Sequence, residues 1–253
     1  MNIKLFFWVI IFVFNFIGLN SLELVFNTQE FAPFSYNIDG VVSGPGVDVI
    51  TAVCEKTGTI KPTFNLLPWT RAQQEVKDGK AHALFLIGKN KEREETFYFS
   101  HPIIITEYGF FVTTDNKKEF KDIVDFKEMT VGVYGPSNTA TTLEEIKEKI
   151  KDMKIDQTVD DESGFRKLSY NRINAVFSNI DVGYALLKKL NIKNVKYVYS
   201  YKKIKYYVGF SKQFVDKKTV DKFNDAYTAL YKEKTIKNII DGYQMVIAPL
   251  EWF

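Results

Sequence analysis

The sequence has one cysteine and two histidines, and this scarcity excludes several kinds of site. Cys54 has no partner for an internal disulfide, so the fold does not depend on one. His82 and His101 lie far apart and lack neighbours at metal-ligand spacing, which argues against a metal site. The sequence also lacks a GxSxG nucleophile motif, a phosphate-binding loop and a CxxC pair. We therefore expect no metal, no cofactor and no enzyme of these classes.

The sequence also lacks a large excess of basic or acidic residues. The chain has 34 basic and 31 acidic residues, a formal net charge of +3, and its lysines are scattered rather than gathered in a stripe. This distribution argues against nucleic acid as a partner. No repeat of short fixed period and no low-complexity stretch is present. At 253 residues and 45% hydrophobic, the chain has enough apolar residues for one large core or two of ordinary size.

The first 21 residues contain one charged side chain, Lys4, ahead of a dense apolar run. Their sequence is MNIKLFFWVIIFVFNFIGLNS. Asn15 and Gly18 interrupt the run, which is short for a membrane span of about 20 apolar residues. The pattern predicts a secretory signal peptide over residues 1–21 and a mature chain in the periplasm. An uncleaved membrane anchor is the alternative.

Strand and helix patterns alternate in the first part of the mature chain. Expected strands cover 22–26, 63–67 and 81–87, and expected helices cover 46–57 and 69–78. Strand–helix–strand repeats predict an α/β fold with a parallel sheet covered by helices. Ligands of such sheets bind at the carboxyl ends of the strands.

The same alternation begins again after residue 129. Strands are expected at 130–134, 174–178 and 196–200, with helices after the loop GPSNTAT and over 180–190. Two α/β units predict two lobes with a cleft between them. The extended segments 108–115 and 205–212 are the expected crossings between the lobes.

These crossings divide the mature chain into three parts. We expect residues 22–112 to form the first part of lobe 1, residues 113–206 to form lobe 2, and residues 207–253 to return to lobe 1. The last helices have one apolar face, which we expect to pack on lobe 1. This face consists of Val220, Phe223, Tyr227 and Leu230.

An arginine stands directly after one of these strands, in the stretch FLIGKNKERE (85–94). A parallel strand that ends at Ile87 directs the following residues towards the cleft, and Gly88 lets the backbone approach a ligand closely. If a helix begins here, its free amide groups favour an anion. Arg93 adds a planar group that binds a carboxylate through two hydrogen bonds. The alternative is a solvated run of charges, with Arg93 paired to Glu92 or Glu95.

Three stretches resemble one family of binding proteins. They are FAPFSYNIDGVVSGPGVDVI, PWTRAQQEVKDGK and KEREETFYFSHPI. Their order and spacing are similar to those of the extracytoplasmic solute-binding proteins of amino-acid ABC transporters, which include the histidine- and glutamine-binding proteins. The resemblance covers about residues 22–245. It implies a two-lobed periplasmic-binding-protein-like fold of type II, and a monomer that closes on a small ligand and delivers it to an ABC permease in the membrane.

The resemblance also implies roles for particular residues. Arg93 falls where the family binds the α-carboxylate of the ligand, and Phe31 falls where an aromatic ring lies against the ligand. Trp69 matches a position in the pocket wall. Ser137 and Asn138 match groups of the second lobe that meet the carboxylate.

The chain departs from the family pattern at two places. Where the family has serines or threonines before the arginine, this chain has Phe85, Leu86 and Gly88. Where the family has an aspartate that binds the ligand's ammonium group, it has Asn179, with Asp181 two residues later. An amide does not neutralise an ammonium ion, and an unpaired buried charge costs several kcal/mol, roughly. Either Glu30 supplies the missing anion or the ligand lacks a free amine.

Two further side chains have two interpretations each. Arg71 follows Trp69 in the first turn of a helix and either reaches the cleft as a second cation or points to water. Tyr134, at the end of a strand, either lines the pocket or packs in the core. The acidic run Asp160–Glu162 is typical of solvated surface.

The sequence thus favours capture of a small polar solute that bears a carboxylate. One alternative is a ligand-sensing module that works with a membrane receptor. The other is a dehydratase-type enzyme on the same scaffold, in which one buried glutamate of raised pKa acts as the general acid.

Overall fold

The structure is a computed structural model that describes residues 21–251. The predicted signal peptide lies outside the described residues, apart from Ser21, and stays a prediction. Within residues 21–251, no helix has the length and apolar character needed to cross a membrane.

One sheet of ten strands runs through the molecule. Eight strands form its main path, in the order β4-β1-β5-β11-β7-β10-β8-β9, while β12 pairs with β7 and β6 pairs with β11. The strands are β1 (Leu22–Thr28), β4 (Ile60–Leu66), β5 (Ala83–Gly88), β6 (Phe97–Phe99), β7 (Ile104–Thr113), β8 (Thr130–Tyr134), β9 (Lys154–Thr158), β10 (Ala175–Asn179), β11 (Val195–Ser211) and β12 (Val246–Ile247).

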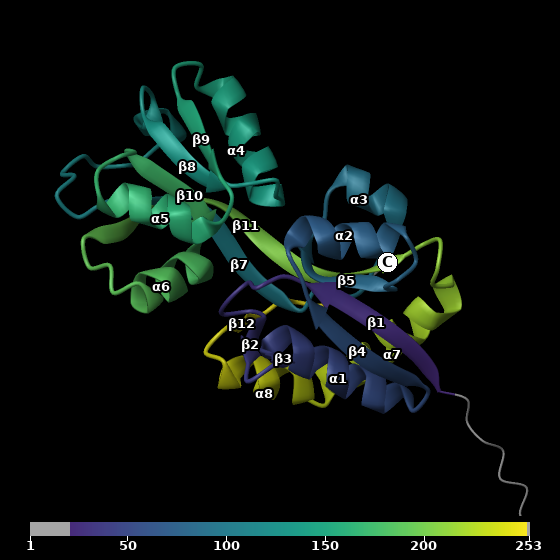
Figure 1. The fold of residues 1–253 in the computed structure, drawn as a ribbon. Helices are drawn as coiled ribbons and strands as arrows, with labels where there is room; N and C mark the ends of the chain where they lie inside the picture. The colour runs from purple at the N-terminus through teal and green to yellow at the C-terminus, as the bar shows by residue number, and fades with distance from the viewer. Residues whose placement is uncertain (1–20, 252–253) are drawn as a thin grey trace, which may run out of the picture.

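The first α/β unit surrounds one end of this sheet, where β1 pairs in parallel with β4 and β5. Its helices are α1 (Pro45–Thr57), α2 (Trp69–Lys77), α3 (Lys91–Thr96), α7 (Lys217–Lys232) and α8 (Thr235–Gly242). The C-terminal helix α7 lies against α1, so the chain returns to this unit as expected (Figure 1). The predicted apolar face of α7 is buried, Phe223 and Tyr227 completely. A small hairpin, β2 (Tyr36–Ile38) with β3 (Val41–Ser43), projects from the unit.

The second unit surrounds the other end, where β8 pairs in parallel with β9 and β10. Its helices are α4 (Asn138–Lys149), α5 (Asp161–Ser169) and α6 (Ile180–Lys189), and a short 3₁₀ helix (Ile123–Phe126) precedes it. Figure 1 shows this unit standing apart from the first, to the upper left. Neither β9 nor α5 was expected from the sequence pattern.

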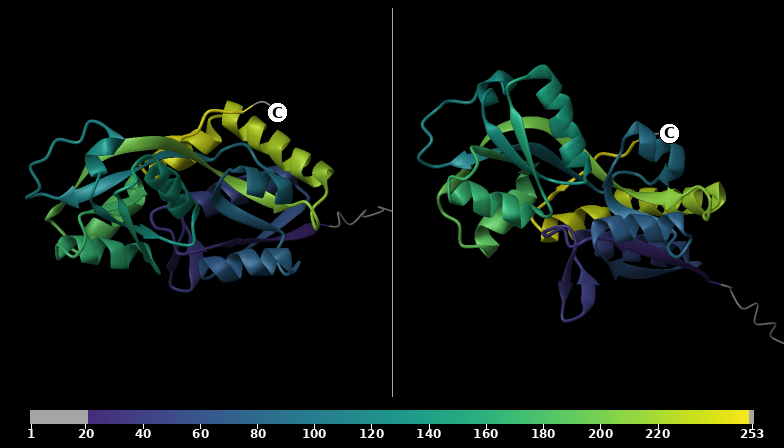
Figure 2. Two further views of the ribbon diagram at one scale, coloured as in Figure 1. Left: turned by 90° about the horizontal axis from the view of Figure 1, so that it is seen from above. Right: turned by 45° about the horizontal axis from the view of Figure 1, so that its top comes forward.

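Two long antiparallel strands, β7 and β11, join the units. The segments 196–200 and 205–212, expected as separate strands, form the single strand β11 of 17 residues. Its register against β7 shifts twice, between Tyr197 and Tyr199 and between Ser200 and Lys202. Both views in Figure 2 show this ribbon passing from one unit to the other. The predicted lobe boundaries fall at the end of β7 and inside β11, and their exact positions stay a prediction.

The core of the first unit contains the single cysteine. Cys54 is fully buried on α1, and burial raises the pKa of its thiol to about 12. The thiolate is the reactive form, so a buried thiol of this kind is unreactive at neutral pH.

Candidate functional site

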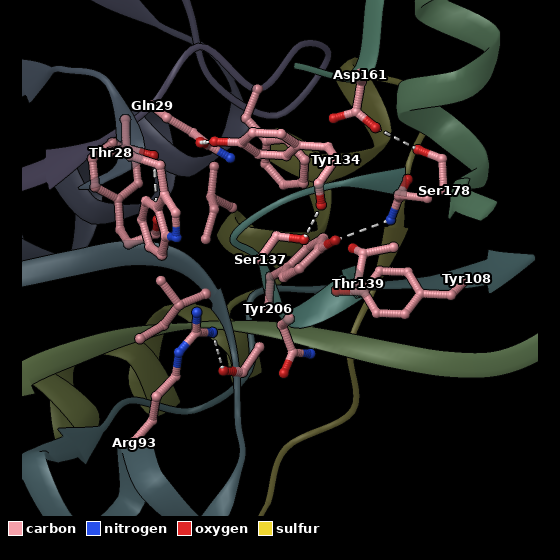
Figure 3. Close-up of a pocket in the computed structure, with 18 residues that line it drawn as sticks. Thr28, Gln29, Arg93, Tyr108, Tyr134, Ser137, Thr139, Asp161, Ser178 and Tyr206 are labelled. Atoms are coloured by element: carbon pink, nitrogen blue, oxygen red, sulfur yellow. Dashed lines mark hydrogen bonds between the residues drawn. The ribbon is translucent and has the colours of Figure 1, made fainter. Parts of the chain in front are cut away.

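The strand ends of both units meet at one cavity (Figure 3). Its lining comes from the carboxyl ends of β1, β5, β8 and β10, from the crossing strands β7 and β11, and from the first residues of several helices. The lining residues are Thr28, Gln29, Phe31, Trp69, Phe85, Leu86, Ile87, Gly88, Arg93, Tyr108, Tyr134, Ser137, Asn138, Thr139, Asp161, Ser178, Asn179 and Tyr206. All the predicted site residues except Arg71 are among them. Their contacts with a ligand stay predictions.

Arg93 is held in this cavity by the first turn of α3. The Asn90 side chain caps the helix by accepting the Arg93 backbone N–H at 2.9 Å, as expected of an N-cap asparagine. Arg93 Nη1 donates to the Gly88 carbonyl at 2.7 Å, and its guanidinium carbon lies 5.6 Å from the centre of the Trp69 ring.

Burial removes water from this guanidinium and lowers its pKa, although the group stays cationic. Within residues 21–251 no acidic side chain forms an ion pair with Arg93, so the alternative pairing with Glu92 or Glu95 is not observed. The cavity therefore contains a half-buried positive charge that has no ion-pair partner among the described residues.

Arg71 lies elsewhere, which corrects the expectation that it reaches the cleft. Its side chain is 67% exposed and its Nε donates to Glu75 at 3.0 Å, one helical turn along α2. The apolar face of α2, with Trp69, Ala72 and Val76, is buried, and position 71 falls on the opposite side. Arg71 is therefore removed from the candidate site.

Aromatic rings form one wall of the cavity. The Phe31 ring meets the Tyr206 ring edge-on, with centroids 5.5 Å apart, and also contacts Phe34 at 5.1 Å. Tyr206 is buried, and desolvation raises the pKa of its phenol well above the ordinary value. These rings give the cavity a rigid apolar side, as is common where small molecules bind.

The start of α4 forms the side of the cavity in the second unit. The Ser137 hydroxyl caps this helix by accepting the Ala140 N–H at 3.1 Å and donates to the Tyr134 carbonyl at 2.6 Å. Asn138 and Thr139, the first residues of the helix, line the cavity. A helix start of this kind stabilises negative charge.

Three contacts join the two units across the cavity. Tyr134 Oη donates to Gln29 Oε1 at 3.1 Å, and Asn90 Nδ2 donates to Asn138 Oδ1 at 3.2 Å. Gly88 also lies against Asn138, since a Cβ atom at position 88 would be 3.0 Å from Asn138 Nδ2. A side chain at position 88 would therefore require the Asn138 amide to shift by a few tenths of an ångström.

Asn179 lines the cavity, but its amide is fully used by the protein. Its Oδ1 accepts the N–H groups of Asp181 and Val182, at 2.8 and 3.2 Å, and thereby caps α6. Its Nδ2 donates to Thr106 and to Tyr206, both at 3.1 Å. Both amide hydrogens are thus taken, and no ligand is needed to satisfy this side chain.

The carboxylates considered near Asn179 do not replace the missing aspartate. Asp181 accepts a hydrogen bond from Thr106 and does not line the cavity. Glu30 is exposed and lies at the wider outer mouth of the cleft rather than in the cavity.

Asp161 does line the cavity, which corrects the expectation that the run Asp160–Glu162 is solvated surface. It is the first residue of α5, and Ser178 at the end of β10 donates to its Oδ1 at 2.9 Å. Desolvation by burial, with a contribution from the charge of Asp160, raises the pKa of Asp161 to about 6. Figure 3 shows Arg93 and Asp161 on opposite sides of the cavity.

Several other lining residues were not predicted from the sequence. Most of them lie at the carboxyl ends of strands, where ligands of parallel sheets bind. Thr28 and Gln29 end β1, and Ser178 precedes the last residue of β10. Tyr108 and Tyr206 lie on the crossing strands, where nothing in the local sequence distinguishes cavity from core. No group of histidine, cysteine and acidic residues suited to a metal ion is found in the described part of the chain.

The comparison with protein families decides the class of the protein. Residues 24–245 match the model of the bacterial extracellular solute-binding proteins, family 3. The chain belongs to this family. The resemblance identified from the three sequence stretches is therefore confirmed, and members of this family act outside the cytoplasm. No match was found among curated proteins.

Solved structures confirm the predicted fold class for this family 3 protein. A histidine kinase sensor domain with similarity to periplasmic binding proteins has a TM-score of 0.81 and 18% identity, covering 91% of this chain and 99% of that one. An ancestral arginine-binding protein bound to arginine has a TM-score of 0.77 and 22% identity, with coverages of 87% and 97%. The ancestral amino acid-binding protein AncCDT-1, a precursor of cyclohexadienyl dehydratase, has a TM-score of 0.74 and 18% identity, with coverages of 87% and 94%. At these identities the likeness establishes the fold alone.

Proposed function

We propose that this family 3 protein captures a small carboxylate-bearing solute, an amino acid or a related compound, in the periplasm and delivers it to an ABC permease. The solute binds in the cavity between the two lobes and favours the closed conformers because it contacts both. In this proposal the protein is a monomer and has no catalytic activity.

The observation that carries the proposal is the state of Arg93. A half-buried cation without an ion-pair partner loses part of its hydration, and a carboxylate offsets this cost by forming two parallel hydrogen bonds with the guanidinium. The start of α4, in the other lobe, adds a second group favourable to negative charge. An anion in the cavity is therefore bound from both sides.

Arg93→Ala tests the proposal. Truncating one member of a buried charge pair costs roughly 2 to 5 kcal/mol, which corresponds to about 30-fold to several thousand-fold in affinity. A thermal-shift screen of amino acids, small carboxylates, amines and sugars first identifies a ligand of the wild type. Calorimetry with that ligand should then show no binding to the variant at micromolar concentrations.

Arg71→Ala is the matched control. It removes the same charge from the same lobe, but its guanidinium is exposed and bound to Glu75, so the affinity should stay at the wild-type value. Wild-type affinity in Arg93→Ala, or a screen in which only neutral sugars bind, would contradict the proposal.

A sensing role is the second candidate, because the sensor domain of a histidine kinase shares this fold over nearly the whole chain. The two roles differ in what cells lose without the protein. In cells that lack it, a delivery protein predicts loss of uptake of the labelled ligand, whereas a sensing module predicts normal uptake and loss of the response to the ligand.

An enzyme is the third candidate, because AncCDT-1 has this fold and is a precursor of a dehydratase. Asp161, with its pKa raised to about 6, has the character of a general acid near neutral pH. Mass spectrometry of a ligand incubated with the protein distinguishes the two classes, since a binding protein leaves the ligand intact.

A further inference from the structure

The cavity contains a second charge that the capture of a simple carboxylate does not use. Asp161 lies in the second lobe, on the side of the cavity opposite Arg93 (Figure 3). Its carboxylate accepts one hydrogen bond, from Ser178 at 2.9 Å. Among residues 21–251, no other hydrogen bond and no ion pair reaches it. Asp161 therefore resembles Arg93, because each has one hydrogen bond and no ion-pair partner among the described residues.

Two cations of the second lobe pair with Glu162, the residue that follows Asp161. Arg166 donates to Glu162 at 2.7 Å, and Lys189 lies 3.4 Å from the other oxygen of Glu162. Neither forms an ion pair with Asp161. Because Asp161 and Glu162 are successive residues of a helix, their side chains point in different directions, and only Asp161 reaches the inner cavity.

A solely structural role does not require a carboxylate at this position. The helix α5 is already capped by Asp160, whose side chain accepts the Ser163 N–H at 2.6 Å. The hydrogen bond from Ser178 is equally available to an asparagine oxygen. What an asparagine lacks is the negative charge, and that charge is unfavourable in a desolvated site unless a cation joins it.

We propose that Asp161 is the counter-ion of an ammonium group of the ligand, so that the captured solute is a zwitterion held by Arg93 in one lobe and by Asp161 in the other. This inference rests on the proposed function and narrows its substrate class to compounds with both a carboxylate and an ammonium group. Asp161 replaces the aspartate that this chain lacks at Asn179, from a different helix. Ser178 positions the carboxylate through its hydrogen bond.

Pairs of compounds that differ only in the ammonium group test the inference. Each of a panel of L-amino acids is compared, at about pH 7, with the carboxylate in which hydrogen replaces the amine and with its N-acetyl derivative. For the wild type, loss of the ammonium group should weaken binding of the preferred amino acid by about 30-fold or more, since it leaves Asp161 buried and unpaired. Calorimetry or a competition assay provides the dissociation constants.

Asp161→Asn should remove most of this difference. The variant should bind the amino acid at least about 30-fold more weakly than the wild type and should discriminate little between the amino acid and the matched carboxylate. A general loss of structure would weaken both compounds and leave their ratio unchanged, so the ratio separates a direct role from a structural one. Circular dichroism and thermal unfolding report on folding. The variant should be at least as stable as the wild type, because it no longer buries a charge.

Asp152→Asn serves as the control, because it removes an exposed carboxylate from the same lobe, where it pairs with Lys127 at 3.2 Å. It should keep wild-type affinity and discrimination. If the wild type binds carboxylates without an ammonium group equally well, and Arg93→Ala abolishes that binding, the zwitterion inference is wrong and the proposed function stands. If neither amino acids nor carboxylates bind, both are wrong.

Discussion

At the scale of single residues, the site contains two opposite charges, and both side chains are half-buried. Burial lowers the pKa of Arg93 and raises that of Asp161, the changes expected when a charged form loses its hydration. Among the described residues, neither charge has an ion-pair partner, although each side chain has one hydrogen bond. A ligand that supplies the two missing partners gains more from binding than its contact area alone would give.

The raised pKa of Asp161 makes ligand affinity depend on pH. With a pKa of about 6 in the free protein, Asp161 is ionised at pH 7 and mostly protonated at pH 5. The bound ammonium group favours the ionised form, so affinity for an amino acid should fall as the pH drops through 6, by about tenfold at pH 5. Calorimetry across this range measures the fall.

Other groups near Asp161 do not explain such a fall. The neighbouring charged and titratable side chains are Asp160, Glu162, Tyr134, Tyr108, Lys189 and Tyr206. Desolvation raises the pKa values of the Tyr134 and Tyr206 phenols, and the hydrogen bond from Arg166 lowers the pKa of Glu162. Both histidines lie outside the cavity, and desolvation lowers their pKa values. Asp161→Asn should therefore bind with an affinity that varies little over this range. An equal fall in the variant would assign the effect to another group.

Sequence reasoning predicted one of these two charges and missed the other, for a physical reason. Arg93 follows a strongly apolar strand and a glycine, so the sequence pattern predicts its position near the end of that strand. Asp161 lies among acidic neighbours in a run that is typical of solvated surface. Only the packing of α5 against β10 turns this one carboxylate inwards, and packing is not a local property of the sequence.

At the scale of elements, the same limit explains what was missed. The strand β9 is at the edge of the sheet and has polar residues, so its apolar period is weak. The helix α5 is short and contains Gly164, which weakens its helical pattern. The strands β5, β8 and β10 and the helix α1 had clear patterns and were predicted within a few residues, and the apolar face of α7 was identified.

The ribbon of β7 and β11 joins the two lobes. Gly109 lies in β7 opposite the irregular part of β11, and a Cβ atom there would be 2.2 Å from the Tyr199 carbonyl and 2.3 Å from the Tyr197 hydroxyl. Gly109→Ala should therefore destabilise the fold by about 1 to 3 kcal/mol through overpacking. Urea denaturation measures the change in the free energy of unfolding.

Gly242→Ala is the control for this substitution. Gly242 is the last residue of α8, and a Cβ atom there would have no neighbour within 4 Å. The change should leave stability equal or slightly higher. A wild-type denaturation midpoint in Gly109→Ala would contradict the prediction, because it would show that the strands accommodate the added methyl group without a loss of stability.

At the scale of the whole molecule, the two α/β units were readable from the repeated alternation of strand and helix. Their contact across the cavity was not, because it depends on single side chains such as Tyr134, Gln29 and Asn138. In the structure the lobes touch at these side chains. In the proposed function, closure on a ligand is favoured by contacts of this kind between the lobes.

Tyr134→Phe tests the contribution of these contacts. The change removes the hydrogen bond to Gln29 and keeps the ring, so closure should weaken by about 0.5 to 1.5 kcal/mol, or roughly 2- to 12-fold in ligand affinity. Small-angle X-ray scattering should show a larger mean size of the ligand-free variant. Tyr170→Phe, on the exposed surface of the second lobe, should change neither quantity. Unchanged affinity in Tyr134→Phe would mean that this bond makes no net contribution to closure.

The placement of Arg93 and Asp161 in different lobes has one more consequence, for competition outside the cell. Simple anions such as acetate, phosphate and chloride neutralise the Arg93 guanidinium but leave the Asp161 carboxylate without a cation. Free amines neutralise Asp161 but leave Arg93 without an anion. If the cleft closes around any one of these ions, it encloses one charge of the protein that has no partner. Acetate, phosphate and chloride should therefore compete weakly with a ligand that carries both charges, even where these ions are far more concentrated.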